Sequence, residues 1–304
     1  MQKAPLIAST AGNGPDIAKA LSRTGWCLLE EALPSETIAA ITRDLDPLFD
    51  QTAFCEGGFY GERTKRFGRL LSRSPVAQEL VEHPAILAAV DDVLRPWCDT
   101  IQLNLTQAIE IHPGALPQLP HRDQDMWQGT KGEMEYLVNV MWPLTPFTAE
   151  NGATLIYPDS HGARAQSDED PENPLPVECS PGSAILFLGS TLHGAGGNRT
   201  ALPRRGIIIS YCLGWLKPYE NQWLAYPPEI ARDFSPSLAA LVGYRQHRPN
   251  LGNVDGLCPS LLLTDTRSDR GACDALRSDQ AVLVADYVAR QRGALSPSGE
   301  GPRP

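Results

Sequence analysis

The sequence predicts an α+β fold that is mainly β, and three observations indicate it. Helical patterns fill residues 15–95, and short apolar or alternating segments follow from Thr100 onwards. Clusters of Pro, Gly, Asn and Asp separate those segments, as turns do between antiparallel strands. The 304 residues include 26 Gly and 27 Pro, which favours a turn-rich β protein over a helical bundle. An antiparallel sandwich or barrel with packed helices fits this order of elements.

The first 99 residues are predicted to be mainly helical. Their apolar periodicity indicates helices over residues 15–25, 34–49 and 75–94, and Pro34 stands at the start of the second. The segment 26–33 between the first two helices, WCLLEEAL, is compatible with a strand. We expect this part to pack on the β part rather than to form a domain of its own.

The β core is predicted between residues 100 and 216. Its strands are expected at 100–112, 135–144, 153–158, 183–189 and 204–216. Further helices are expected over 223–234, 236–245 and 279–292, with a loop over 248–259. The sequence therefore predicts one domain over 1–294, composed of parts 1–99, 100–216 and 217–294, and a disordered tail over 295–304.

Charge and cysteine content exclude several classes of protein. The 36 acidic residues outnumber the 26 basic ones and give a net charge of −10, which argues against nucleic acid or anionic lipid as a partner. The seven cysteines are scattered without a Cys-x-x-Cys pair, so neither a disulfide framework nor a zinc ribbon is indicated. No segment is apolar enough for a signal peptide or a membrane span, so we expect a cytoplasmic protein.

Two histidines and a carboxylate form a candidate metal site. His121 and Asp123 of HRDQDMW project from one face if their backbone is extended, and His193 follows 72 residues later, where an apolar strand enters a Gly-rich turn. Two imidazoles and one carboxylate on one side of a metal leave three positions open, as in non-haem Fe(II) oxygenases. Each residue also has an ordinary interpretation: HRD as a polar loop, and His193 as a strand-end histidine bonded to a carbonyl.

Arg204 and Arg205 open the predicted strand RRGIIISY. A buried arginine at a strand start suits a bidentate pair with a small carboxylate, whereas an exposed one forms a surface ion pair. Adjacent strand residues face opposite sides, so only one of the two can point inward. Gly206 lies on the face of Arg204 and leaves room beside it, which favours Arg204 and leaves Arg205 as the alternative.

Four motifs in order carry a family resemblance: HRDQDMW, NGATLIYPDSHG, PGSAILFLGSTLHGAGGNRT and RRGIIISY. Together with the less distinctive TKRFGRLLSRSP before them, they resemble the phytanoyl-CoA dioxygenase family of Fe(II)- and 2-oxoglutarate-dependent oxygenases. The resemblance extends from Thr64 to Leu216 and is strongest with the branch that tailors fungal terpenoids and alkaloids. It implies a double-stranded β-helix, a cupin-like jelly roll with flanking helices, whose metal lies inside the barrel mouth.

The resemblance also implies site residues. His121, Asp123 and His193 would be the catalytic iron ligands, and the presence of Asp123 argues for oxygen insertion or desaturation rather than halogenation. The residues implied to bind 2-oxoglutarate are Gln118, Thr154, Arg204 and Arg66. Gln118 and Thr154 could equally satisfy nearby backbone, and Arg66 could be a cation on a helix surface.

Aromatic residues supply candidates for a substrate pocket. Trp127, four residues after Asp123, is the candidate favoured here, and a core position is the alternative. Further candidates are Trp142, Trp215, Tyr219 and Trp223. His161 matches a turn of the family and is interpreted as stabilising that turn rather than binding metal.

The sequence therefore predicts a dioxygenase that uses Fe(II), 2-oxoglutarate and O2 to hydroxylate or desaturate a C–H bond of a mostly apolar small molecule, a secondary metabolite, with release of succinate and CO2. A Zn²⁺ hydrolase or isomerase is the alternative, because the same three ligands can hold zinc with an open position. A non-catalytic binding protein is a third reading. The family resemblance also allows a homodimer in which C-terminal segments such as 248–259 cover the active site.

Overall fold

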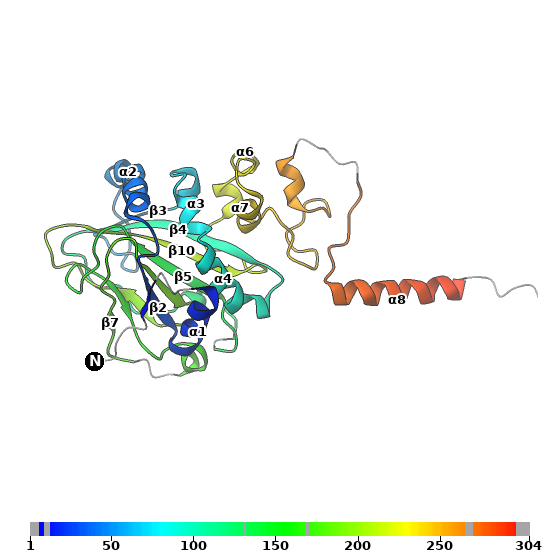
Figure 1. Ribbon diagram of the computed structural model, residues 1–304, viewed down its shortest axis with the longest axis horizontal. Helices are drawn as coiled ribbons and strands as arrows, with labels where there is room; N and C mark the ends of the chain where they lie inside the picture. Colours follow the sequence, from blue (N-terminus) through cyan, green and yellow to red (C-terminus); the bar gives the residue numbers. More distant parts are fainter. Residues whose placement is uncertain (1–5, 9–12, 131, 168–170, 265–269, 296–304) are drawn as a thin grey trace, which may run out of the picture.

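The computed structural model describes residues 6–8, 13–130, 132–167, 171–264 and 270–295, and two β-sheets form its centre (Figure 1). The tail predicted over 295–304 lies outside the described residues, apart from Leu295 at the end of the last helix. Helices cover one side of the larger sheet, and the last helix projects away from the rest of the molecule (Figure 1).

The helices and strands follow the predicted order closely. The helices are α1 (Gly14–Thr24), α2 (Ser35–Gln51), α3 (Ala77–Val81), α4 (Pro84–Leu94), α5 (Gln222–Ala225), α6 (Pro228–Ala231), α7 (Pro236–Leu241) and α8 (Ser278–Leu295). The strands are β1 (Leu6–Ala8), β2 (Trp26–Glu30), β3 (Thr64–Phe67), β4 (Ile101–Ile111), β5 (Leu137–Pro143), β6 (Thr154–Ile156), β7 (Leu175–Pro176), β8 (Ala184–Leu188), β9 (His193–Ala195) and β10 (Arg204–Leu213).

The two sheets form the predicted jelly roll. The larger sheet has seven strands in the order β1-β2-β8-β5-β10-β4-β3, and the smaller has three in the order β7-β6-β9. All neighbouring strands are antiparallel except β1 and β2. This arrangement confirms a mainly β, double-stranded β-helix fold with flanking helices.

Side chains of β10 alternate between two cores. Ile207, Ile209 and Tyr211 join a cluster with the helices, which includes the apolar faces of α1, α2 and α4. Ile208 points the other way, into a smaller cluster between the sheets that contains Phe187 of β8 and Ile156 of β6. The helices therefore stabilise the outer face of the large sheet, and the inner face is left to form the barrel interior.

Local signals explain the first helix. The side chain of Asn13 accepts a hydrogen bond from the Asp16 backbone N–H at 3.0 Å and caps the N-terminus of α1, with Pro15 in its first turn. Gly25 ends α1 in the left-handed conformation, with φ of 78°, which glycine adopts without strain. The chain can then turn directly into β2.

Two predicted helices are each divided by proline. Residues 75–94 form α3 and α4 instead of one helix, because Pro84 cannot donate a backbone hydrogen bond and begins a new helix capped by His83. Residues 223–234 likewise contain most of α5 and all of α6, with Pro227 between them and Pro228 as the first residue of α6. In both places the apolar periodicity continues across the break.

The N-terminal part also supplies more strand than predicted. Besides β2, which fits the WCLLEEAL segment, β1 and β3 extend the large sheet at its two edges. Arg66 therefore lies on β3, paired with Ile109 of β4, and not on a helix surface. Residues 1–99 are predicted to be mainly helical. Their longer elements are helices, but the described part of the range also contains three short strands.

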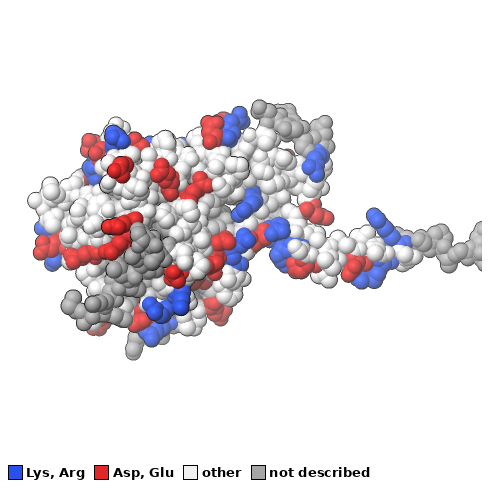
Figure 2. All heavy atoms as spheres, in the orientation of Figure 1, with Lys and Arg blue, Asp and Glu red and all other residues white. Residues whose placement is uncertain are grey.

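The last helix, α8, confirms the prediction of a helix at residues 279–292 and has little contact with the body. Its apolar side chains are exposed, Leu283 by 66% and Tyr287 by 57%. Charged residues of both signs lie along it and across the face of the body shown in Figure 2, without a continuous basic surface on that face. No helix in the described part of the chain is long and apolar enough to cross a membrane.

Candidate active site

The two predicted histidine ligands are brought together by backbone pairing. His193 begins β9, and its N–H donates to the His121 carbonyl oxygen at 3.0 Å, while the His121 N–H donates to the His193 carbonyl oxygen at 2.9 Å. His193 thus starts a strand of the small sheet after the turn that follows β8, instead of ending an apolar strand. Asp123 begins a 3₁₀ turn (Asp123–Met126) rather than lying on extended backbone.

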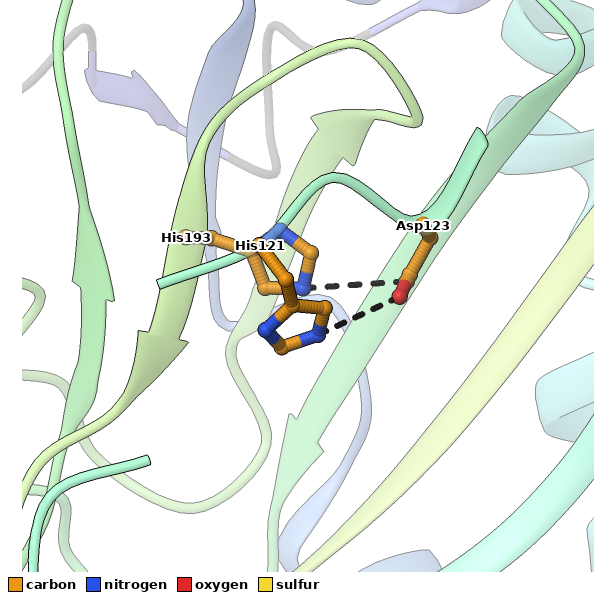
Figure 3. A group of neighbouring side chains, drawn as sticks. All are labelled: His121, Asp123 and His193. Carbon is orange, nitrogen blue, oxygen red and sulfur yellow. Dashed lines mark ion pairs between the residues drawn. The ribbon is translucent and has the colours of Figure 1, made fainter. Parts of the chain in front are cut away.

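The three side chains converge on one point (Figure 3). Asp123 Oδ1 lies 3.4 Å from His121 Nε2, and Asp123 Oδ2 lies 3.6 Å from His193 Nε2. The ligand atoms all lie within 4.8 Å of one another, and this is the one such group of three or more among the described residues. His161, interpreted as a turn residue, is not part of it, since its Nε2 faces the Ser22 carbonyl oxygen at 3.2 Å.

Each histidine ring is oriented by a contact of its Nδ1 atom, the ring nitrogen that does not face Asp123. Nδ1 of His121 lies 2.9 Å from the Leu119 carbonyl oxygen, and Nδ1 of His193 lies 3.0 Å from that of Thr191. A carbonyl oxygen only accepts hydrogen bonds, so the ring proton of the neutral imidazole sits on Nδ1 and the lone pair of Nε2 points toward the partner ligands. The donor set and its orientation therefore fit a divalent metal with open positions.

Burial and mutual contact set the charges of the three groups. Burial lowers the pKa of His193 to about 4, so its imidazole is neutral at neutral pH. Burial would raise the pKa of Asp123, but the two histidines outweigh it and the pKa is about 2. Burial also lowers the pKa of His121, yet its contact with Asp123 leaves that pKa above its ordinary value. The anionic carboxylate and neutral His193 are already in metal-binding form.

The ligand group opens into a cavity of about 100 Å³ inside the jelly roll. All four residues predicted to bind the co-substrate line this cavity together with the three ligands: Gln118, Thr154, Arg204 and Arg66. Its apolar walls come from both sheets and from the 3₁₀ turn, and include Leu105, Ile109, Met126, Met141, Phe187 and Ile208. Sequence positions far apart in the chain thus share one small space.

Arg204 is the arginine that points inward. Arg204 is only 1% exposed. One of its guanidinium N–H groups donates to the Gly152 carbonyl oxygen at 2.5 Å, and the guanidinium carbon lies 3.8 Å from the centre of the Phe147 ring. Burial lowers its pKa to about 9, so it remains a cation at neutral pH. Among the described residues it has no carboxylate partner, and a buried cation without one is suited to an anionic ligand.

Arg205 faces the other side of the sheet, as the strand alternation requires. It forms ion pairs with Glu110 and, at 2.5 Å, with Asp46, and its guanidinium lies over Phe49. These contacts hold the Arg205 side chain away from the cavity. The choice that the sequence left open between the two arginines is therefore decided by their placement.

Other polar groups of the cavity are also short of partners. The Thr154 hydroxyl and the Arg66 Nε are buried without a hydrogen-bond partner among the described residues. Arg66 donates to the Gln107 side-chain oxygen at 3.1 Å, and Gln118 accepts from the Ala195 N–H at 3.3 Å. Buried polar atoms of this kind are normally satisfied, so the cavity is prepared for a polar ligand.

Trp127 does not line the cavity, which corrects the prediction that it contacts substrate. Its indole N–H donates to the Lys217 carbonyl oxygen at 2.9 Å, and its ring packs against Tyr136 and the core beneath the helices. Closeness to Asp123 in sequence did not fix the direction of the side chain, because the 3₁₀ turn rotates it away.

Sequence reasoning missed several residues of the site. Phe59, Tyr60 and Gln107 line the cavity, and Phe147 packs on Arg204 from outside it. Phe59 and Tyr60 belong to an irregular segment without periodicity, whose one signal is the surrounding glycines of GGFYG. Tyr219, considered as one of several aromatics, does line the cavity.

Comparison with known proteins agrees with this geometry. The model of the phytanoyl-CoA dioxygenase (PhyH) family matches residues 21–206. The chain is 32% identical over 291 residues to dioxygenase FrzG of Cladobotryum sp, which covers 86% of this chain and 94% of that protein. It is 31% identical over 263 residues to the multifunctional dioxygenase ausE of Aspergillus calidoustus, and this match covers 81% of this chain and 87% of that protein.

Among solved structures, the fold is similar to that of the epimerase SnoN in complex with Fe³⁺, alpha ketoglutarate and nogalamycin RO. The TM-score is 0.55 with 17% sequence identity, over 66% of this chain and 84% of that chain, a likeness that concerns the fold. The family match spans more than half of the chain and contains every candidate ligand residue of the cavity. The chain therefore belongs to the phytanoyl-CoA dioxygenase family of Fe(II)- and 2-oxoglutarate-dependent oxygenases.

Proposed function

We propose that this protein is a dioxygenase that uses Fe(II), 2-oxoglutarate and O2 to hydroxylate or desaturate a C–H bond of a mostly apolar small molecule of secondary metabolism. The observation that carries the proposal is that one buried cavity is lined both by the metal-ligand group and by the cation of Arg204, which has no carboxylate partner among the described residues. An oxygenase of this class needs both, and a simple metal site needs only the first.

His121, Asp123 and His193 would hold the iron. When bound, Fe(II) would activate O2, the oxidant: 2-oxoglutarate would supply two electrons as it is converted to succinate and CO2, one oxygen atom would enter succinate, and the other would be available to oxidise substrate. The chain's part is to fix the two Nε2 atoms and the carboxylate on one side of the metal through the His121–His193 bridge. It also surrounds the site with apolar side chains that exclude water.

Arg204 would pair with the distal carboxylate of 2-oxoglutarate, with Thr154, Gln118 and Arg66 as further donors. The Thr154 hydroxyl and Arg204 Nε have no hydrogen-bond partner among the described residues, so a carboxylate would satisfy both. Phe147 keeps the guanidinium in place from the other side. This set of donors supports an oxygenase over a Zn²⁺ hydrolase or isomerase, which has no need of a second carboxylate site.

The substrate class rests on the wall of the cavity and on the relatives. The remaining lining is mostly aliphatic or aromatic, as in Leu105, Met141 and Phe187, which suits an apolar molecule. FrzG and ausE are named as dioxygenases, and the SnoN structure holds nogalamycin RO. The acidic net charge favours a small molecule over a polyanion as partner, and a cytoplasmic location is part of the proposal.

A single domain over residues 1–294 that forms a homodimer is the assembly we favour. The exposed apolar residues of α8, such as Leu283 and Tyr287, are more than a lone helix in water normally presents. A second copy of the chain would cover them. This part of the proposal is independent of the chemistry at the metal.

Formation of succinate from 2-oxoglutarate tests the proposed activity. Fe(II)-loaded protein should convert 2-oxoglutarate slowly in air, and Asp123→Ala should abolish the conversion, because a ligand and its charge are lost. Asp125→Ala is the matched control, since Asp125 lies in the same 3₁₀ turn but outside the ligand group. Full succinate formation by Asp123→Ala, or turnover that needs Zn²⁺ and no O2, would contradict the proposal.

A further inference from the structure

The catalytic cavity is too small for the substrate that the proposed function requires. Its volume is about 100 Å³, whereas sites for small organic molecules usually offer roughly 300–1,000 Å³. A second cavity of about 530 Å³ adjoins it. The residues that line both cavities, and so form the partition between them, are Phe59, Tyr60, Arg66, Ile111, Gln118 and Ala195.

Two of these residues belong to an irregular segment between α2 and β3. The ring of Phe59 meets the ring of His121 edge to face, with centroids 4.9 Å apart, although Phe59 remains 48% exposed. Tyr60 lies beneath the Arg66 guanidinium at 5.0 Å and its hydroxyl bonds to the Tyr219 hydroxyl. This part of the partition thus depends on ring contacts and on one hydroxyl pair.

The two sides of the Tyr60–Tyr219 contact are anchored differently. The Tyr219 N–H donates to the Asn104 side-chain oxygen at 2.7 Å, and the next N–H, of Glu220, donates to the Asn104 carbonyl oxygen at 3.0 Å. Asn104 is fully buried on β4 and donates to Ser210 of β10, so Tyr219 is fixed to the sheet. Its position does not depend on Tyr60.

The Tyr60 side is flanked by Gly57 and Gly58, which nothing packs against, and by Gly61, where a Cβ would lie 3.6 Å from the Thr64 methyl group. A side chain built at Gly57 or Gly58 would meet no atom within 4 Å, and Gly57 and Gly61 adopt positive φ of 88° and 86°. The segment is tied at its end by the Thr64 hydroxyl, which donates to the Tyr60 carbonyl oxygen at 2.6 Å. The Gly61 N–H donates to the Gly57 carbonyl oxygen at 3.1 Å, and the Thr64 hydroxyl also bonds to the Gly61 carbonyl oxygen. Residues 57–61 thus form a turn that is tied at Thr64 and can move as a unit.

The second cavity has a mixed lining with an apolar part. The apolar part consists of Ile111, Ala195, the segment Ala115–Pro117 and Phe59, and the polar part includes Glu62, Arg66 and Gln118. The one aromatic pair at the boundary is Phe59 and Tyr60, next to the metal ligand His121. Arg63, whose Nε donates to the Pro113 carbonyl oxygen at 2.6 Å, also lines this cavity.

We propose that Phe59 and Tyr60 form a movable partition, held by the Tyr60–Tyr219 contact, and that the substrate displaces it and occupies both cavities. The reacting carbon then lies on the metal side, and the apolar body lies against Ile111, Ala115 and Pro117. Phe59 and Tyr60 thereby determine the size of substrate that the enzyme accepts. This inference rests on the proposed function, since it assumes the iron site.

Access of chelators to the iron tests the partition without knowledge of the substrate. The full-length protein, loaded with Fe(II) and 2-oxoglutarate without O2, is mixed with the small chelator 2,2′-bipyridine or the larger bathophenanthroline disulfonate, and the absorbance of the coloured iron complex gives the rate of removal. Spontaneous iron release adds equally to both rates, so it is obtained by extrapolation to zero chelator and subtracted. The ratio of the remaining chelator-dependent rates reports size selection.

Wild-type protein should favour the small chelator, and Phe59→Ala should reduce that preference by about fivefold. Tyr219→Phe, which removes only the hydroxyl contact, should reduce it in the same direction by a smaller factor. Adding Ala115→Leu to Phe59→Ala narrows the second cavity and should restore part of the preference. Phe54→Ala is the matched control, because Phe54 is in the same segment and 46% exposed but lines neither cavity.

The outcomes separate this inference from the proposed function. Equal rate ratios in wild type, Phe59→Ala and Tyr219→Phe would overturn the partition, as would an equal effect of Phe54→Ala. In either case, a visible absorption band that requires both Fe(II) and 2-oxoglutarate would leave the proposed function standing. Absence of that band in the wild-type protein would instead overturn the proposed function itself.

Discussion

His121 and His193 lie opposite each other in one antiparallel bridge, in which each backbone N–H donates to the carbonyl oxygen of the other, at 2.9 and 3.0 Å. Their ring centroids are 4.4 Å apart. The spacing of the two imidazoles is thus set by strand register rather than by loop conformation. Asp123 follows His121 by two residues, and this short step brings its carboxylate to the same point. A motif as short as HRD can therefore supply two of the three ligands.

Metal affinity should depend on pH through His121. Asp123 and His193, with pKa values of about 2 and about 4, are in metal-binding form throughout the neutral range. His121 has a raised pKa and must lose its proton to bind, so affinity for Mn²⁺ should fall about tenfold per pH unit below that pKa and level off above it. Titration calorimetry between about pH 5.5 and about pH 8.5 measures this dependence. Affinity that falls as pH rises would contradict the assignment of His121.

Arg204→Met should weaken 2-oxoglutarate binding by about 10–100-fold, the effect of losing charged hydrogen bonds worth about 1.5–3 kcal/mol. Arg205→Ala is the matched control on the next residue. It should leave binding unchanged but destabilise the fold by ~1–3 kcal/mol, because Glu110 remains buried. Equilibrium binding and thermal unfolding separate the two effects. Loss of 2-oxoglutarate binding in Arg205→Ala alone would reverse the assignment.

Phe147→Leu should reduce 2-oxoglutarate affinity several-fold, because the ring that holds the Arg204 guanidinium at 3.8 Å is lost. Phe49→Leu is a fitting comparison, since Phe49 is equally buried and lies 4.7 Å from the guanidinium of Arg205. Both substitutions should destabilise the fold by a similar ~1–2 kcal/mol. Equal loss of 2-oxoglutarate affinity in the two variants would show that the ring acts only through stability.

Removal of residues 276–304 should convert a dimer into a folded monomer. The apolar residues of α8 are exposed, and none belongs to the core clusters, so the melting temperature of the body should change little at high dilution. Light scattering across a concentration series measures the mass of both proteins. A monomeric full-length chain, or a dimer that persists after the truncation, would contradict the proposed role of α8.

The sequence predicts those features that depend on local periodicity. The strands around Val140, Leu186 and Ile208 are confirmed because apolar runs between Gly and Pro clusters have few alternatives. Arg204 and Arg205 lie on opposite faces for the same reason. The metal-ligand group could be predicted because His121 and Asp123 lie in one short motif and only His193 is distant in sequence.

Other features depend on tertiary packing and escape such reasoning. The direction of Trp127 follows from the 3₁₀ turn at Asp123, and the role of Phe147 follows from its contact with Arg204 at the start of the neighbouring strand β10. Phe59 and Tyr60 reach the cavity from an irregular segment, with no periodicity to indicate which way they point. Prolines 84, 227 and 228 divided helices whose apolar pattern ran on across them.

The central claim is that one cavity holds Fe(II) and 2-oxoglutarate together. Anaerobic ultraviolet–visible titration of the metal-free protein tests it most directly. A weak visible charge-transfer band should appear only when both are added, vanish in His193→Ala, and persist in His161→Ala, whose ring lies outside the ligand group. A folded, metal-loaded wild-type protein without the band, or a band of full strength in His193→Ala, would contradict the account.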